Sequence, residues 1–206
     1  MLKTLDIAFR LTIVTLALTG LAYPLAMTAL AQTLFPGRAN GSLVAGQEGR
    51  IVGSELIGQA FAGPAYFHAR PSAAGDGYDA TNSGASNLGP TSAKLRDRVA
   101  GDVVRLSKEN PAARDPVPAD LATTSGSGLD PHISPDAALW QVPRVAQARG
   151  VDEERLKSLV AAHLESRDLG FLGERRVNVL LLNLALDQEL GRPVPSAKAD
   201  PLTPVP

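Results

Sequence analysis

The sequence predicts an α+β protein with a single N-terminal transmembrane helix, followed by a small mixed helix/strand domain outside the cytoplasm. Three observations lead to this prediction. No charged residue occurs between Arg10 and Arg38. After Phe35-Pro36-Gly37 the composition becomes that of a soluble protein. Beyond that point, stretches with helical periodicity alternate with short candidate strands and with long loops rich in glycine, serine and proline.

The uncharged run divides the chain into four expected parts. These are a short cytoplasmic end at 1–10, a transmembrane helix at 11–34, an extracytoplasmic domain at 35–191 and a Pro-rich flexible tail at 192–206. A helix of about 20 residues crosses the hydrocarbon core of a bilayer, so the uncharged run is long enough with some tilt. Lys3 and Arg10 precede it, which favours a cytoplasmic N-terminus.

A cleaved signal peptide is the alternative interpretation of the N-terminal segment. Ala29-Leu30-Ala31 resembles a small-x-small cleavage site, and the segment has a positively charged start. The apolar stretch is longer than the core of a signal peptide, which has about 7–15 residues. We therefore favour an uncleaved anchor. Both interpretations place the rest of the chain outside the cytoplasm.

At helical spacing the span has one face of large side chains, mostly leucine, and one of small side chains. The small residues are Thr12, Thr15, Thr19, Ala22 and Ala26. Helices associate in lipid through close packing of small residues, because the hydrophobic effect does not drive them together there. We expect the small face to contact a partner helix and the leucine face to contact lipid. Pro24 is expected to kink the upper half.

The first half of the domain is expected to contain two short strands, at 50–53 and 66–70, with a short helix capped by Ser54 at 54–61 between them. The stretch 71–90 is crowded with glycine, serine, asparagine and alanine, and it is expected to be a long loop. Loops of this length inside a compact domain are frequently functional.

The second half of the domain is expected to be mainly helical. Apolar residues at helical spacing predict an amphipathic helix at 91–109, and 116–131 is expected to be a loop. Further helices should start at Ser134, with a break or kink at Pro143, and at Asp152. The stretch 177–190 is apolar nearly all round, which predicts a buried helix, with a strand in its first half as the alternative.

Composition excludes several functional classes. Twenty basic residues against twenty-one acidic ones give a formal charge of −1, which argues against a nucleic-acid-binding protein. The absence of cysteine excludes disulfides, thiolate catalysis and Cys-based zinc sites. The three histidines, His68, His132 and His163, are too scattered to predict a His-rich metal site. The glycine–lysine pattern of a P-loop is also missing.

Two loops contain residues that could take part in catalysis or bind a ligand. Asp130 and His132 could act as acid and base or supply two metal ligands, but a hydrogen bond that pins their loop is the favoured interpretation. The stretch 123–128 could bind an anion through its backbone N–H groups, although a hydrogen-bonded turn is favoured. The oxygens of 83–90 could coordinate a weakly hydrated cation. An anchored periplasmic enzyme or ligand-binding protein that uses the loop 125–132 is the alternative function.

Four segments together resemble a known family, the C subunit of the Kdp potassium-transporting P-type ATPase (KdpC). The resemblance covers the chain from its start to about residue 190. Ala85 stands where the family pattern has a second glycine, Arg175 where it has proline, and Leu181 where it is often polar. The segments are YFHARPSA at 66–73, SGASNLGP at 83–90, TTSGSGLDPHISP at 123–135 and RVNVL at 176–180.

The resemblance implies a non-catalytic accessory subunit in a bacterial inner membrane, with a single span, a cytoplasmic N-terminus and a periplasmic domain. Its partners would be a channel-like potassium-translocating subunit and an ATP-hydrolysing subunit, besides membrane lipid. It would have no cofactor of its own and would meet ATP and K⁺ only through the complex. The family role includes stabilising assembly and acting as a catalytic chaperone that raises the ATP affinity of the hydrolysing subunit. A domain outside the cytoplasm cannot touch cytoplasmic ATP, so we expect this effect to act through the membrane helices.

The resemblance also directs attention to the loops 71–90 and 121–135. We expect them to cap the outer mouth of the potassium path. The candidate contact residues in and beside these loops are Arg70, Ser83, Ser86, Asn87, Ser125, Ser127, Asp130 and His132.

Overall fold

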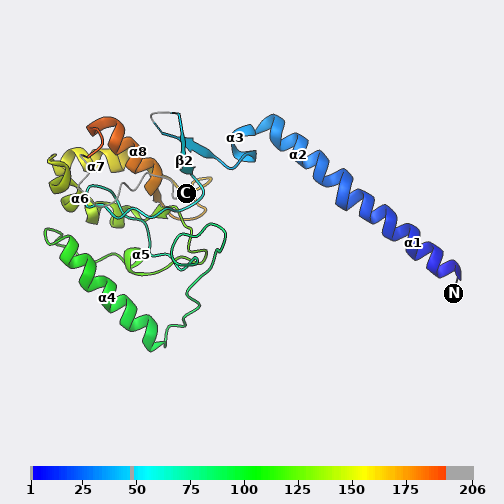
Figure 1. Ribbon diagram of the computed structural model, residues 1–206, viewed down its shortest axis with the longest axis horizontal. Coiled ribbons are helices and arrows are strands. Elements are labelled where there is room, and N and C mark those ends of the chain that lie inside the picture. Colours follow the sequence, from blue (N-terminus) through cyan, green and yellow to red (C-terminus); the bar gives the residue numbers. More distant parts are fainter. Residues whose placement is uncertain (1, 47–48, 194–206) are drawn as a thin grey trace. The chain divides into compact units, whose positions relative to one another are not determined.

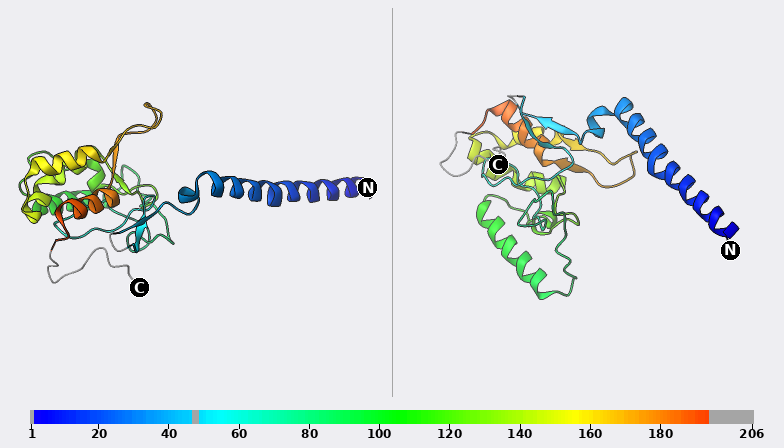
Figure 2. Two further views of the ribbon diagram at one scale, coloured as in Figure 1. Left: turned by 90° about the horizontal axis from the view of Figure 1, so that it is seen from above. Right: turned by 45° about the vertical axis from the view of Figure 1, so that its right-hand side comes forward.

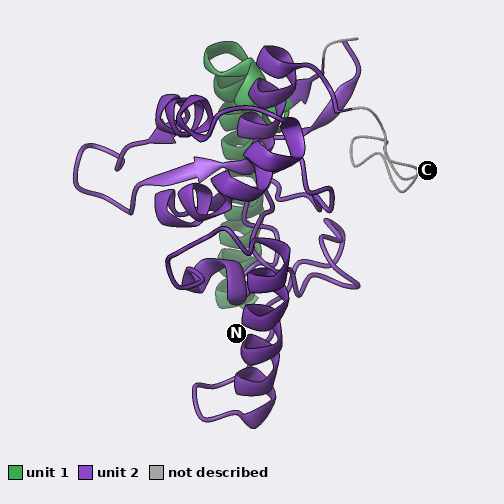
Figure 3. Ribbon diagram, turned by 90° about the vertical axis from the view of Figure 1, so that its left-hand side faces the viewer, with its two compact units in different colours: residues 1–43 green, residues 44–206 purple. Residues whose placement is uncertain are grey.

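The computed structural model describes residues 2–46 and 49–193 (Figure 1). The chain divides into two compact units, residues 1–43 and residues 44–206 (Figure 3). Each unit is described by itself below. Most of the predicted Pro-rich tail, from residue 194 onward, lies outside the described residues.

The first unit is dominated by a helical segment from Leu2 to Leu34 that is long and apolar enough to cross a membrane. It consists of α1 (Leu2–Ala17), a π-helical turn η1 (Leu18–Ala22) and α2 (Tyr23–Leu34). A short α3 (Pro36–Ala39) follows. The expected short end at 1–10 is itself helical from Leu2 onward, with an ion pair of 3.0 Å between Arg10 and Asp6 one turn apart.

The π-turn lies just before Pro24, and the kink expected from this proline stays a prediction. Proline has no N–H to donate to the carbonyl four residues earlier, and its ring crowds that carbonyl. A π-turn widens the helix by about one residue, which relieves the crowding and rotates the following residues by about 100°. Thr12 and Thr15 precede the turn and Ala26 follows it. The small face expected along the whole span is therefore displaced around the helix axis part of the way along.

The second unit begins with a β-hairpin. Strand β1 (Leu43–Ala45), which the sequence did not predict, pairs with β2 (Ile51–Ser54). The strand expected at 50–53 is confirmed within one residue. The short helix expected at 54–61 is wrong, because this stretch forms only a turn in which the Ser54 hydroxyl accepts a hydrogen bond from the Leu56 N–H at 3.1 Å. The first turn of a helix is unfavourable to form, so a helix this short has little stability of its own. Tertiary hydrogen bonds therefore decide the conformation of this stretch.

A three-stranded antiparallel sheet lies at the centre of the second unit, in the order β3-β5-β4. The strands are β3 (His132–Ile133), β5 (Arg176–Asn178) and β4 (Leu164–Glu165). Val177 of the middle strand faces Ile133 on one side and Leu164 on the other. All three strands are very short, and β5 leads directly into α8 (Val179–Leu190). The helix expected at 177–190 is therefore confirmed, apart from its first two residues.

The remaining helices are α4 (Ala93–Glu109), α5 (Ala119–Ala122), α6 (Pro135–Arg149) and α7 (Glu153–Ala162). Figure 1 shows α6, α7 and α8 gathered together, with α4 on the other side of the unit. Val145, Leu156, Val177 and Leu186 are completely buried in the core that these elements share. A break or a kink was expected at Pro143. The break is wrong, because α6 runs through this residue and ends at Gly150, which has the left-handed conformation of a helix cap, and the kink stays a prediction.

The strand expected at 66–70 is also wrong, for an unusual reason. The chain here has no strand partner among the described residues, and its backbone is hydrogen-bonded by helix side chains instead. Asn183 of α8 accepts from the Phe67 N–H at 2.9 Å and donates to the Phe67 carbonyl at 2.9 Å. Gln141 of α6 does the same for His68, at 2.7 and 3.1 Å. These amides replace a neighbouring strand and fix the segment from which the long loop departs.

Candidate functional site

The candidate site is formed where the loop 71–90 meets the loop 123–131. The Ser72 hydroxyl donates to the Gly128 carbonyl at 2.6 Å. The Ser127 carbonyl accepts from the Gly84 N–H at 2.9 Å and from the Ser83 hydroxyl at 3.0 Å. Two segments that the sequence separates by more than 40 residues are thus joined, and Ser83 lies next to Ser127.

Gly128 is the closest point of contact between the two loops. Its φ of +70° lies in the left-handed region. A Cβ atom at this position would lie 2.6 Å from both the Ala74 nitrogen and the Gly84 carbonyl oxygen. No side chain fits into that gap, so the junction depends on glycine both for its backbone conformation and for its space.

The hydroxyl-rich stretch before Gly128 is a hydrogen-bonded turn. The Ser125 hydroxyl accepts from the Gly128 N–H at 2.9 Å, and the Ser127 hydroxyl accepts from the Leu129 N–H at 3.1 Å. These backbone N–H groups are therefore used inside the turn and do not point together toward an external anion. The favoured interpretation of 123–128 as a structural turn is confirmed.

Asp130 ties this turn to the rest of the domain. Its carboxylate forms an ion pair with Arg70 at 3.1 Å and accepts from the His132 N–H at 3.0 Å. Burial by itself would raise the pKa of the Asp130 carboxyl, but hydrogen bonds from His132 and the charge of Arg70 outweigh it and bring the pKa below its usual value. Arg70 also donates to the Thr124 carbonyl at 3.4 Å. The expected pinning of the loop by Asp130 and His132 is confirmed.

The imidazole of His132 lies between two carboxylates. Its Nδ1 is 3.4 Å from Asp130, and its Nε2 is 3.7 Å from Glu165. Glu165 in turn pairs with Arg176 at 2.9 Å. A chain of polar contacts therefore runs from the loop across β3 and β4 to β5. Among the described residues no serine hydroxyl is hydrogen-bonded to His132, so the arrangement lacks the nucleophile–base contact of a catalytic triad.

Ser86 and Asn87 differ from the other six loop candidates. Asn87 is exposed and has a positive φ of 50°, and Ser86 is partly exposed. Within the described part of the chain neither side chain has a hydrogen-bond partner. These two polar groups therefore remain available for an external contact, whereas Arg70, Ser83 and the residues of the 125–132 turn are engaged inside the domain. Contact between 83–90 and a cation stays a prediction.

The other two histidines have structural surroundings. His68 lies 3.0 Å through Nε2 from the Gly63 carbonyl, and burial, followed by the charge of Arg144, lowers its pKa to about 4. His163 lies at the end of α7, where its Nδ1 is 3.0 Å from the Leu159 carbonyl. Across residues 2–46 and 49–193, no three His, Asp or Glu side chains converge closely enough to hold a metal ion.

The buried Arg144 of α6 makes its hydrogen bonds to uncharged oxygens. The guanidinium donates to the carbonyls of Pro64 and Tyr66 at 2.7 and 3.0 Å and to the side-chain oxygen of Gln141 at 2.8 Å. Burial lowers the pKa of Arg144 to about 10. Its function in the structure is to satisfy the backbone carbonyls of the segment 64–66.

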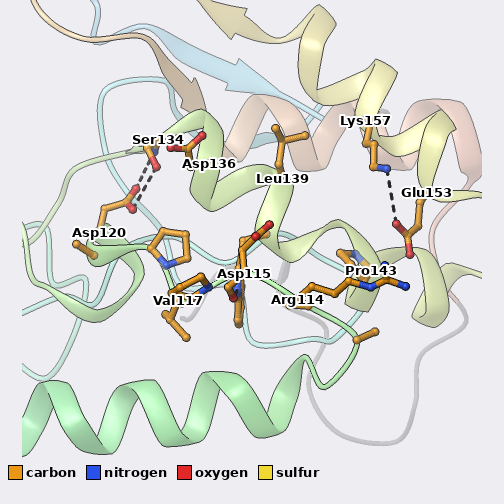
Figure 4. Close-up of a pocket in the computed structure, with 16 residues that line it drawn as sticks. Arg114, Asp115, Val117, Asp120, Ser134, Asp136, Leu139, Pro143, Glu153 and Lys157 are labelled. Atoms are coloured by element: carbon orange, nitrogen blue, oxygen red, sulfur yellow. Dashed lines mark hydrogen bonds and ion pairs between the residues drawn. The ribbon is translucent and has the colours of Figure 1, made fainter.

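A cleft that the sequence did not indicate lies beside these loops (Figure 4). It has a volume of about 1090 Å³ and is bordered by the segment 112–120, α6 and α7. Asp120 accepts from the Ser134 N–H at 2.7 Å, and Lys157 approaches Glu153 at 3.8 Å along its wall. The prolines at 116 and 118, which disfavour helix and strand before α5 begins, were the only hint of this cleft in the sequence. The cleft is a recessed surface with paired charges.

On the membrane-type helix, Thr12, Thr15 and Thr19 line a shallow groove together with Leu11 and Leu16. The Thr19 hydroxyl donates to the Thr15 carbonyl at 2.8 Å. Because its polar group is satisfied within its own helix, this side chain offers a compact surface without an unpaired donor. Ala22 and Ala26 do not line this groove.

Comparison with known proteins points to one family. The family model described as "KdpC: K+-transporting ATPase, c chain" matches residues 5–188. A potassium-transporting ATPase KdpC subunit from Myxococcus xanthus is 60% identical over 197 residues, which cover 96% of this chain and 93% of the relative. The same subunit from Methylobacterium nodulans is 62% identical over 85% of this chain and 92% of the relative. That from Koribacter versatilis is 55% identical over 95% of this chain and 100% of the relative.

Proposed function

The chain belongs to the KdpC family, and on that premise we propose that it is a non-catalytic accessory subunit that stabilises a potassium-importing ATPase complex. Its partners are a channel-like potassium-translocating subunit and an ATP-hydrolysing subunit. It contributes no cofactor and meets ATP and K⁺ only through these partners. One observation carries this proposal: the side chains of the candidate site that could take part in catalysis or bind a ligand are hydrogen-bonded or ion-paired inside the domain.

That engagement argues for a scaffold and against an anchored enzyme. The carboxylate of Asp130 holds Arg70 and the loop backbone, and the hydroxyls of Ser125 and Ser127 hold the turn. A catalytic group must be free to reach the reacting atoms. If one of these groups took part in a reaction, it would have to give up its present contacts, and the junction between the two loops would loosen.

The proposed orientation places the N-terminus in the cytoplasm and the domain in the periplasm of a bacterial inner membrane. Lys3 and Arg10 lie on the N-terminal side of the apolar helix, as the positive-inside rule requires. A map of reporter fusions before residue 11 and after residue 191 tests this orientation in cells. A cytoplasmic position for the domain would overturn the proposal.

In this orientation an effect on ATP affinity has to cross the membrane. We propose that the subunit raises the ATP affinity of the hydrolysing subunit as a catalytic chaperone, through contacts of its membrane helix. Such couplings between separate sites are commonly worth about 1–3 kcal/mol, or about 5–150-fold in affinity. The groove lined by Thr12, Thr15 and Thr19 supports this proposal, because it allows close approach of a partner helix.

The decisive experiment replaces Thr15 and Thr19 together by leucine in the co-expressed complex. The added bulk should separate the packed helices, lower the yield of partner subunits that co-purify with this chain and raise the KM for ATP of the complex that remains. Val14→Leu is the matched control, because it adds bulk on the face expected to contact lipid. An unchanged complex with Thr15→Leu and Thr19→Leu would show that the packing face is assigned wrongly.

A further inference from the structure

The connection between β4 and β5 forms a hairpin that projects from the body of the domain (Figure 2, left). Three large apolar side chains lie at its end. Leu169 is 83% exposed, Phe171 is 70% exposed and Leu172 is 49% exposed. Single exposed leucines are common on protein surfaces, but three large apolar residues gathered at one projecting tip are typical of an interaction site. We refer to residues 168–172 as the apolar tip.

The apolar tip is held in one defined shape. The N–H groups of Asp168 and Leu172 each donate to the other residue's carbonyl at 2.9 Å. Between them, Leu169 has a φ of +53° and Gly170 has a φ of +82°. A leucine rarely adopts a left-handed backbone, and strained positions of this kind cluster where a function requires them. Here the strain serves to present a large apolar side chain to the surroundings.

Paired charges surround the base of the tip. Arg167 bonds to Glu174 at 2.6 Å, and Arg176 lies 3.4 Å from Asp168. The segment 164–176 contains three acidic and three basic residues, so its formal charge is 3 − 3 = 0. Surfaces that bind anionic lipid carry an excess of Lys and Arg, which is lacking here. An apolar centre with a polar, ion-paired rim is instead the usual anatomy of a protein–protein contact.

We propose that the apolar tip inserts into an apolar recess with a polar border on a partner protein of the transport complex, on the side of the membrane where this domain lies. This inference rests on the proposed function and adds to it a specific contact surface. Because the tip is already ordered by its backbone bonds and ion pairs, little conformational freedom is lost on docking. The side chains of Leu169 and Phe171 are the anchors, and the paired charges exclude water around them.

The first test places a photo-crosslinking phenylalanine analogue at position 171 of the full chain in membranes that contain the complete complex. Illumination should join this chain to another protein subunit. The same analogue in place of Leu56, which is 59% exposed on a different part of the domain, is the matched control. Crosslinks to lipid alone, or none at position 171, would overturn the inference.

The second test measures how well partner subunits are retained by variants of the tip. Leu169→Asp and Phe171→Asp should each increase loss of the partners by about tenfold or more, because a charge would enter an apolar recess. Leu56→Asp should retain them as the unaltered chain does. Leu169→Gly separates binding from folding, because glycine relieves the positive φ and removes only the anchor. It should unfold no more easily than the unaltered chain and still lose its partners.

These outcomes distinguish the two levels of the proposal. If the unaltered chain fails to co-purify with any transport subunit, the proposed function is wrong. If the unaltered chain co-purifies and the aspartate variants do so equally well, the proposed function stands and the inference about the apolar tip is wrong. A retention defect in Leu56→Asp equal to that of the tip variants would also contradict it.

Discussion

Replacing Asn183 by leucine tests whether helix side chains substitute for a β-strand along the extended segment. Asn183 is 1% exposed and Phe67 is fully buried. The amide of Asn183 satisfies both the N–H and the carbonyl of Phe67, each at 2.9 Å. Leucine is close to asparagine in size, so the substitution removes both hydrogen bonds without opening a large cavity.

The expected loss of stability follows from the two backbone groups that are left unpaired. A buried polar group without a partner costs about 1–3 kcal/mol, so the pair costs about 2–6 kcal/mol. Burying the leucine side chain returns about 1.5–3 kcal/mol of favourable transfer free energy. Taking the middle of each range, about 4 kcal/mol of cost less about 2 kcal/mol of gain, the net destabilisation should be about 2 kcal/mol, which is a large part of the stability of an ordinary domain.

Urea unfolding of the purified full chain in detergent, followed by the near-UV signal of Trp140, measures this loss as a lower midpoint at unchanged slope. Thr123→Val is the matched control, because the hydroxyl that it removes donates to the Ala119 carbonyl at an exposed position. That control should stay within about 0.5 kcal/mol of the unaltered chain. A loss below about 1 kcal/mol for Asn183→Leu would refute the reasoning and mean that the 66–68 segment relaxes to find other partners or water.

Three further substitutions test other parts of the domain. Gly128→Ala should destabilise it by about 2 kcal/mol or more in thermal unfolding, through the positive φ and the 2.6 Å contacts at the loop junction. Gly126→Ala, which meets nothing within 4 Å, should change little, and equal effects of the two would contradict the packing argument. Because burial lowers the pKa of His68 to about 4, protonation favours the unfolded chain, so stability should fall between about pH 6.5 and pH 4 by up to about 3 kcal/mol. His68→Gln should flatten this part of the pH–stability curve, and a slope identical to that of the unaltered chain would exclude His68 as its source. Arg149→Met should cost about 3–5 kcal/mol in urea unfolding, because it removes the ion pair of 2.7 Å with the buried Asp187. We therefore expect a larger loss than for Asn183→Leu, and a smaller one would contradict the reasoning.

The helices were predictable because their signals are local. Ser134 and Asp152 cap α6 and α7 with side-chain hydrogen bonds, as the sequence indicates. The apolar run before Arg38 predicts the membrane-type helix from length alone. Pro143 shows the limit of such rules, since the helix continues through it within a well-packed core whose contacts outweigh the missing hydrogen bond.

Strand β2 was predicted within one residue, but β1, β3 and β4 were not, because the stability of such short strands comes from distant partners. Two or three residues are too few to display the alternation that identifies a strand. At 66–70 the sequence predicted a strand, but the chain there has no strand partner among the described residues. Its partners are instead side chains 73 and 116 residues further along the chain, and no local pattern identifies them.

The candidate site was predicted in part. The sequence identified both loops and the contact of Asp130 with His132 that pins one of them. The structure shows that this chain of contacts continues from His132 through Glu165 to Arg176 on the sheet. That continuation depends on the pairing of β4 with β5, which the sequence did not indicate. For the same reason the projecting hairpin between these strands was missed.

The segments that carry the family resemblance lie mainly where the domain holds itself together. The stretch 66–73 is bonded to α6 and α8, and the stretch 123–135 forms the pinned turn. Resemblance in such segments identifies the scaffold, because these segments make hydrogen bonds inside the domain. The surface that contacts a partner has to be sought among groups without such bonds. Ser86, Asn87 and the exposed side chains of the apolar tip meet that condition, so variants at these positions should alter assembly while leaving unfolding unchanged.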